Sequence, residues 1–145
     1  METLFLISNL LVMPFWGLMI FLPRWRGTER IMASLWPVAV TALLYTVLVL
    51  PNVPALLPAL SNPDLATIAA LLGAPAGATV AWVHFLAFDL FVGRWVYWDG
   101  RRTGLRAWVT SLILFFVLMV GPLGLVLYLA ARSLKTHTVS LVTEA

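Results

Sequence analysis

The chain has 145 residues, of which 62% are hydrophobic and only 10% are charged, so it has too little polar surface to cover a soluble globule of this size. It contains no cysteine, which excludes disulfides, thiolate metal sites and thiol nucleophiles. The net charge of +3 comes from arginines beside apolar runs, a pattern that favours anionic lipid headgroups and gives no support for nucleic acid as a partner. We therefore expect an integral membrane protein with a single membrane domain over residues 1–145.

The first long apolar run covers residues 3–22, and about 20 apolar residues at roughly 1.5 Å each are enough to cross the hydrocarbon core. The run resembles a signal peptide, but its start has no positive charge and residues 21–25 lack the small side chains of a cleavage site. We therefore predict that it is a transmembrane helix. After the basic segment PRWRGTER, a second span is expected at residues 29–50, with Thr28 as its capping residue.

The segment 51–77 contains five prolines, which forbid one continuous helix, yet it stays apolar and carries a single charge at Asp64. Within it, Asn62 as the cap and Pro63 at the first helical position predict a short helix over residues 63–72. Its apolar spacing is typical of a helix that lies in the membrane interface or over the mouth of a bundle. Two interpretations stay open, a lid over a binding site and a simple connector.

Two further spans are expected at residues 78–98 and 107–131, separated by the polar segment DGRRTGLR. The predicted fold class is therefore all-α, an integral membrane four-helix bundle with a short interfacial helix between spans two and three. The loops after spans one and three hold Arg24, Arg26, Arg30, Arg101, Arg102 and Arg106. By the positive-inside rule both arginine loops are expected in the cytoplasm and both termini outside.

Three of the four expected spans contain a proline, at positions 14, 37 and 122. Each proline leaves the carbonyl four residues before it without its helical donor, and in hydrocarbon such a carbonyl needs a partner from a neighbour, a water or a ligand. These carbonyls belong to Leu10, Ala33 and Leu118. A functional cavity and ordinary kinking for close packing are the two explanations.

The third span carries three groups that hydrocarbon disfavours, His84, Asp89 and Arg94. At about 100° per residue, successive members point about 140° apart, so they do not form one catalytic face. Arg94 lies close enough to the basic boundary to snorkel. Asp89 lies near the middle of the span, where an ionised carboxylate costs several kcal/mol or more, so it must be protonated, paired or hydrated. A functional acid and a structural hydrogen bond are both open for Asp89.

The helical wheel divides the third span into two sides. One apolar sector is expected to face lipid and consists of Val83, Leu86, Leu90 and Tyr97. The opposite sector, expected to face inward, consists of His84, Phe88, Phe91 and Trp95. Asn9 of the first span lies at a similar depth and is a candidate hydrogen-bond partner of His84, whose other interpretation is that of a satisfied core histidine.

Metal and cofactor chemistry have little support in the sequence. His84 is the only histidine within an expected span and His137 lies in the polar tail, so ligation by two histidines is not expected. The sequence has neither a nucleophile elbow nor a glycine-rich phosphate loop. We therefore expect no metal and no cofactor.

The segment VHFLAFDLFVGRWVYWDGRR closely resembles the signature of the abscisic-acid-deficiency-four-like family, small membrane proteins of plants, algae and bacteria. The matching elements are His84, Asp89-Leu90-Phe91 and Gly93-Arg94-Trp95. More loosely, the resemblance extends to the four-span layout and the proline-rich loop. The plant members are required to form neoxanthin from violaxanthin, which implies the opening and rearrangement of a carotenoid epoxide without net redox change.

The resemblance implies a bacterial family member in the cytoplasmic (inner) membrane that acts in carotenoid (xanthophyll epoxide) or isoprenoid-lipid metabolism. Asp89 would donate a proton to the epoxide oxygen and His84 would handle the other proton transfer, so these two are the candidate catalytic residues. The candidate binding residues are Asn9, Phe88, Phe91, Arg94 and Trp95.

The alternative is a noncatalytic module that binds a lipid or polyene and stabilises a membrane assembly through self-association. The expected partners are therefore membrane lipids, a carotenoid ligand and a second copy of the chain.

Overall fold

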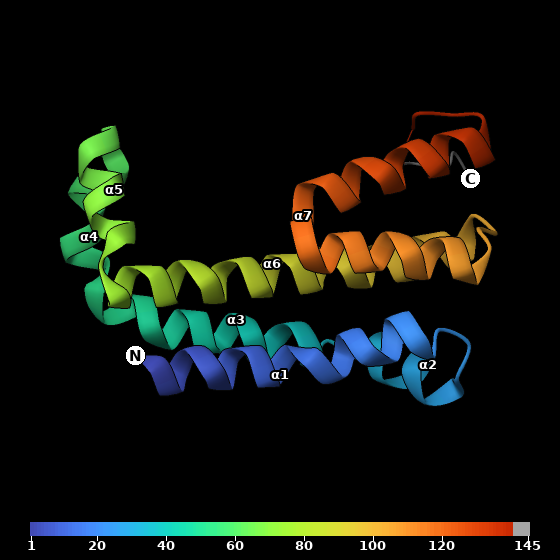
Figure 1. Ribbon diagram of the computed structural model, residues 1–145, viewed down its shortest axis with the longest axis horizontal. Coiled ribbons are helices and arrows are strands. Elements are labelled where there is room, and N and C mark those ends of the chain that lie inside the picture. Colours follow the sequence, from blue (N-terminus) through green and yellow to red (C-terminus); the bar gives the residue numbers. More distant parts are fainter. Residues whose placement is uncertain (141–145) are drawn as a thin grey trace. The chain divides into compact units, whose positions relative to one another are not determined.

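The computed structural model describes residues 1–140, except for the side chain of Ala55, and all its regular elements in that range are helices (Figure 1). In chain order these are α1 (Glu2–Phe21), α2 (Arg26–Ala33), α3 (Trp36–Val49), the short 3-10 helix η1 (Leu50–Asn52), α4 (Val53–Ser61), α5 (Leu65–Gly73), α6 (Pro75–Arg102) and α7 (Ala107–Thr136). The all-α class expected from the sequence is confirmed. The closed bundle of four spans stays a prediction.

Three helices, α1, α6 and α7, are long and apolar enough to cross a membrane. The pair formed by Arg26–Ala33 and Trp36–Asn52 passes the same test as one span, but it is bent by 45°. The second span expected at residues 29–50 stays a prediction, and the structure breaks that segment into two helices. The bend lies directly before Pro37, whose ring clashes with the carbonyl four residues earlier and whose nitrogen has no hydrogen to donate.

The proline-rich segment forms two short helices, where the sequence predicted one. Helix α4 begins at Val53, tolerates Pro54 in its first turn and has Pro58 inside it. Helix α5 is capped by Asp64, whose side chain accepts from the Thr67 amide at 2.9 Å, rather than by Asn62 as expected. The hydrogen bonds from Thr67 lower the pKa of the Asp64 carboxyl. The prolines thus exclude a continuous helix but permit short ones.

Contacts divide the described chain into two compact units, each built from segments that are far apart in the sequence. Unit 1 consists of Met1–Pro14 and Leu35–Phe88. Unit 2 consists of Phe15–Ser34 and the described part of Asp89–Ala145. The single membrane domain expected from the sequence stays a prediction.

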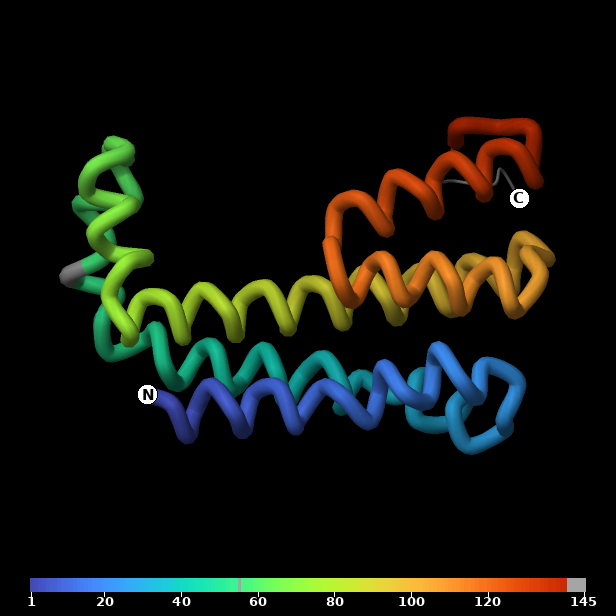
Figure 2. Tube along the Cα trace, in the orientation of Figure 1, coloured from blue at the N-terminus to red at the C-terminus, as the bar shows by residue number. Residues whose placement is uncertain are grey.

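In unit 2, helix α7 is broken near its middle. Val120 (φ −144°, ψ 48°) and Gly121 (φ 0°, ψ −77°) leave the helical conformation directly before Pro122. Because proline has no N–H and glycine has no Cβ, the helix is weakest at this point. Figure 2 shows the chain reversing there, so that the second limb of α7 runs back beside the first.

The reversal shortens the continuous length of α7 that is available to cross a membrane. Its first limb, residues 107–119, is about 20 Å long at roughly 1.5 Å per residue, whereas the hydrocarbon core is about 30 Å thick. The second limb brings Tyr128 and Arg132 to Asp99, near the end of α6 where Arg101 and Arg102 lie. The fourth span expected over residues 107–131 and the expected placement of the carboxyl end opposite the arginine loops stay predictions, although the structure turns this segment back on itself at Gly121.

Candidate functional site

The candidate residues of the signature all lie on α6, and the sector predicted to face lipid is more buried than the sector predicted to face inward. The sector predicted to face lipid is at most 8% exposed and consists of Val83, Leu86, Leu90 and Tyr97. In the sector predicted to face inward, Phe88 is 60% exposed and Phe91 is 52% exposed. Because lipid tails are as apolar as leucine, hydrophobicity alone does not distinguish the two sides of a membrane helix.

In unit 1, the imidazole of His84 lies among aromatic rings. Its centroid is 4.7 Å from that of Phe88 in a stacked arrangement and 5.2 Å from that of Tyr45, from α3, in an edge-on arrangement. Within residues 1–140, His84 has no hydrogen bond to another side chain or to the backbone. Its environment in this unit is therefore aromatic.

The predicted hydrogen bond between Asn9 and His84 is wrong. The amide of Asn9 donates to the Phe5 carbonyl at 2.7 Å, and its oxygen accepts from the Trp82 indole at 3.1 Å. Trp82 and His84 are about 200° apart around α6, so a helix that contacts one does not contact the other in the same way. Asn9 joins α1 to α6 and is not a partner of the histidine.

In unit 2, the half-buried carboxylate of Asp89 lies against the break in α7. A Cβ added at Gly121 would collide with Oδ1 of Asp89 and would lie 3.4 Å from Oδ2. The residues that the structure describes offer Asp89 neither an ion pair nor a hydrogen bond. The Asp89 carboxyl therefore occupies the space that a side chain at position 121 would need. It also lies beside backbone of α7 that no longer has a regular helical hydrogen-bond pattern.

Arg94 closes the carboxyl end of α2. Its Nε donates to the Met32 carbonyl at 2.6 Å and its Nη2 donates to the Ala33 carbonyl at 3.2 Å. The indole of Trp98 donates to the same Met32 carbonyl at 3.0 Å. The prediction that the Ala33 carbonyl needs a donor from a neighbour is confirmed. The guanidinium predicted to bind a ligand is therefore engaged with the backbone.

Trp95 contacts the returning limb of α7. Its ring lies edge-on to Tyr128, with 5.1 Å between centroids. Phe91, by contrast, is exposed. The structure therefore separates the predicted binding residues into groups that hold helices together, Asn9, Arg94 and Trp95, and aromatic rings open to the surroundings, Phe88 and Phe91.

A buried polar cluster that the sequence reading missed lies where the second limb meets α6. Oδ2 of Asp99 accepts from the Tyr128 hydroxyl at 2.5 Å and pairs with Nε of Arg132 at 2.7 Å. Tyr128 is 0% exposed and Arg132 is 4% exposed. The spacing of Tyr128 and Arg132, four residues apart on one helical face, was the signal that could have found them.

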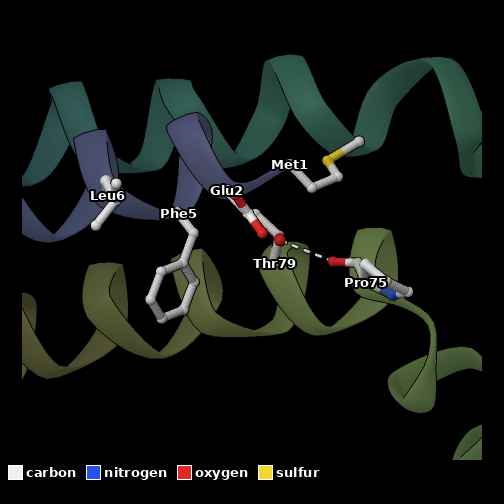
Figure 3. A pocket seen from close by; sticks show the side chains of 6 residues that line it. All are labelled: Met1, Glu2, Phe5, Leu6, Pro75 and Thr79. Atoms are coloured by element: carbon white, nitrogen blue, oxygen red, sulfur yellow. Dashed lines mark hydrogen bonds between the residues drawn. The ribbon is translucent and has the colours of Figure 1, made fainter.

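One hollow lies in unit 1, with a volume of about 420 Å³, between the first turns of α1 and α6 (Figure 3). It is lined by Met1, Glu2, Phe5, Leu6, Pro75 and Thr79. The Thr79 hydroxyl donates to the Pro75 carbonyl at 2.7 Å, so its proton is already used. None of the candidate catalytic or binding residues lines this hollow.

The acidic and histidine side chains of the described part of the chain are few and scattered. No group of three or more His, Asp or Glu side chains there could hold a metal ion. A carboxyl group such as that of Asp89 and an imidazole such as that of His84 can each transfer a proton.

Comparison with known proteins gives one family and one curated relative. A family model described as ABA DEFICIENT 4-like matches residues 3–128. Protein ABA DEFICIENT 4, chloroplastic, from Arabidopsis thaliana is 28% identical over 139 residues, which cover 92% of this chain. The chain spans about 62% of the length of that relative. No solved structure matches the chain.

The family match includes the whole signature segment on α6 and most of α7. The resemblance seen in the sequence is thereby confirmed. The chain belongs to the ABA DEFICIENT 4-like family.

Proposed function

We propose that the protein acts within a membrane in carotenoid metabolism, on a xanthophyll epoxide, or on a related isoprenoid lipid, and that Asp89 is its proton donor. The observation that carries this proposal is the position of the Asp89 carboxyl. It lies half-buried on a helix of membrane-spanning length, beside the break in α7 and outside the hydrogen bonds and ion pairs of the described chain. The Asp89 carboxyl does not join helices through a hydrogen bond or an ion pair of the described chain, and its charge is costly in a membrane-spanning segment. These two properties support a functional role.

The proposed chemistry is an isomerisation. The carboxyl of Asp89 gives a proton to the epoxide oxygen while one of its C–O bonds breaks, and a base removes one proton from carbon. One proton enters and one leaves, so the substrate and product have the same composition and no oxidant is needed. His84 is the candidate for the second transfer.

The outer side of α6 supports a long apolar substrate. Phe88 and Phe91 are exposed and three residues apart, so they lie one above the other on that side of the helix. An exposed aromatic ring on a helix of membrane-spanning length is open to an apolar polyene from the lipid phase.

A noncatalytic module that binds a polyene or lipid is the second candidate. The engagement of Arg94 with the Met32 and Ala33 carbonyls favours it, because that side chain serves packing rather than chemistry. Stacking of His84 on Phe88 is equally consistent with a structural role. In this version, Phe88 and Phe91 hold the ligand and no bond changes.

For the membrane, we propose the bacterial cytoplasmic membrane, with the arginine loops at residues 23–30 and 101–106 on the cytoplasmic side. These loops hold six arginines and one glutamate. The second limb of α7 would then end on the cytoplasmic side too, since Arg132 pairs with Asp99 near Arg102.

The proposal is tested by expressing the chain in a host that accumulates violaxanthin and comparing its pigments with those of the host alone. Chromatography must precede mass spectrometry, because an isomerisation leaves the mass unchanged. A new isomer supports chemistry, and copurification of an unchanged polyene supports the binding module. If neither a new pigment nor a bound polyene is found, the carotenoid assignment fails.

A further inference from the structure

A second hollow, of about 400 Å³, lies within unit 2 where the loop after α1 meets the end of α6 and the first turn of α7. Its polar lining comes from Arg24, Glu29, Tyr97, Arg101 and Thr110. A volume of this size is within the range of small-ligand sites. None of the residues of the proposed proton-transfer chemistry lines it, so it is a separate feature of the molecule.

Within this hollow, one arginine is fixed and the other is free. Nη2 of Arg101 pairs with Oε1 of Glu29 at 2.6 Å, and its Nη1 donates to the Pro23 carbonyl at 2.9 Å. Arg24 has no ion pair in the part of the chain that the structure describes, and it is exposed. The lining contains two arginines and one glutamate, so it has one net positive charge. The Arg24 guanidinium is the group available to bind an anionic ligand.

The other polar groups of the lining are already used. The Tyr97 hydroxyl donates to the Pro23 carbonyl at 2.9 Å, and the Thr110 hydroxyl donates to the Arg106 carbonyl at 3.4 Å. Neither hydroxyl has a proton left to give, and the Tyr97 oxygen already accepts from Nη1 of Arg101 at 3.5 Å. The hollow thus combines a free guanidinium with a pre-positioned one, which is the donor set that suits phosphate oxygens.

The location favours a lipid as the source of that phosphate. The apolar helix α1 ends at Phe21 and α6 ends at Arg102, so the hollow lies at the ends of two helices of membrane-spanning length. Trp25 and Trp108, each next in the chain to a residue of the lining, are exposed at 54% and 64%. Tryptophans and arginines together mark the depth of lipid headgroups.

We propose that this hollow binds the phosphate group of an anionic membrane lipid, with Arg24 as its main ligand and with Arg101, held by Glu29, as the second. The inference does not depend on the carotenoid proposal. Free phosphate offers the same oxygens, so the experiment must separate the two sources.

The test measures binding to the whole protein in detergent micelles, with phosphatidylglycerol, phosphatidylcholine and inorganic phosphate as separate probes. We expect phosphatidylglycerol to bind and Arg24→Gln to weaken it about fivefold, as expected for roughly 1 kcal/mol per arginine at a membrane surface. Arg26→Gln is the matched control, because Arg26 is an exposed arginine two residues away that does not line the hollow.

Each outcome decides the proposal. A loss confined to Arg24→Gln supports a built site, whereas equal losses in both variants show diffuse attraction to an anionic surface and overturn it. If inorganic phosphate at millimolar concentration displaces the lipid, the lipid source is overturned. A melting temperature that stays the same in Arg24→Gln without lipid excludes misfolding as the cause, and Arg24→Lys should recover part of the binding.

Discussion

The guanidinium of Arg94 joins α6 to the end of α2 by donating to two consecutive carbonyls, that of Met32 at 2.6 Å and that of Ala33 at 3.2 Å. In a continuous helix the Ala33 carbonyl would accept from position 37, where Pro37 has no N–H. One side chain therefore compensates for the break between α2 and α3, and its charge lies at the carboxyl end of a helix, where a cation is favoured.

Replacing Arg94 with Met should lower the free energy of unfolding by about 1–3 kcal/mol, because it leaves the Ala33 carbonyl without a donor while Trp98 still donates to the Met32 carbonyl. Arg94→Lys should lose less, because the charge remains but the planar fork that reaches two acceptors does not. Chemical unfolding in micelles, followed by tryptophan fluorescence, measures the difference. The control is Arg30→Met, at an exposed position on α2. Equal stability of the two Met variants would show that Arg94 does not support the break.

Gly121 should not tolerate a side chain, because a Cβ there would collide with Oδ1 of Asp89. We expect Gly121→Ala to cost about 1–3 kcal/mol of unfolding free energy, the usual range for overpacking. Adding Asp89→Ala should remove much of that cost, since it clears the space. A double-mutant cycle measures the coupling, and purely additive costs would mean that the two residues do not meet.

His84 can be tested by separating its aromatic ring from its proton chemistry. His84→Phe keeps a flat ring against Phe88 and Tyr45, whereas His84→Gln keeps polarity and loses the ring. If His84 transfers a proton, both variants should lose pigment conversion by about 100-fold or more. If it only packs, His84→Phe should fold and convert normally and His84→Gln should melt at a lower temperature.

The break in α7 predicts which side of the membrane its end occupies. Because the sequence has no cysteine, single cysteines can be introduced without background. Lys135→Cys, three residues after the buried Arg132, and Arg102→Cys, in the arginine loop, should react with a membrane-impermeant maleimide from the same side. Labelling from opposite sides would restore a straight fourth span and contradict the pairing of Asp99 with Arg132.

The sequence was sufficient to predict the long helices, since about 20 apolar residues in a row leave few alternatives. It also predicted that the carbonyl of Ala33 would need a donor, because proline chemistry is local. The sequence did not predict which residues of α6 are buried, because lipid and protein offer the same apolar environment. Leu90 and Phe91 are equally apolar, and only packing buries Leu90 and exposes Phe91.

The return of α7 was missed for a different reason. Pro122 signals a weak point in the helix, but proline alone does not fix how far the chain turns there. The direction depends on the meeting of Tyr128 and Arg132 with Asp99, residues at least 29 positions from it along the chain. Contacts of that range cannot be read from helical periodicity.

The most direct test of the proposed function compares two variants that make the same chemical change, Asp89→Asn and Asp64→Asn, in the host that accumulates violaxanthin. Asp64 caps α5 outside the long spans, and asparagine caps a helix as well as aspartate does. At equal membrane levels, Asp89→Asn should lose pigment conversion by about 100-fold or more, since an amide has no acidic proton to give, while Asp64→Asn should convert as the unaltered chain does. Full conversion by Asp89→Asn would contradict the account.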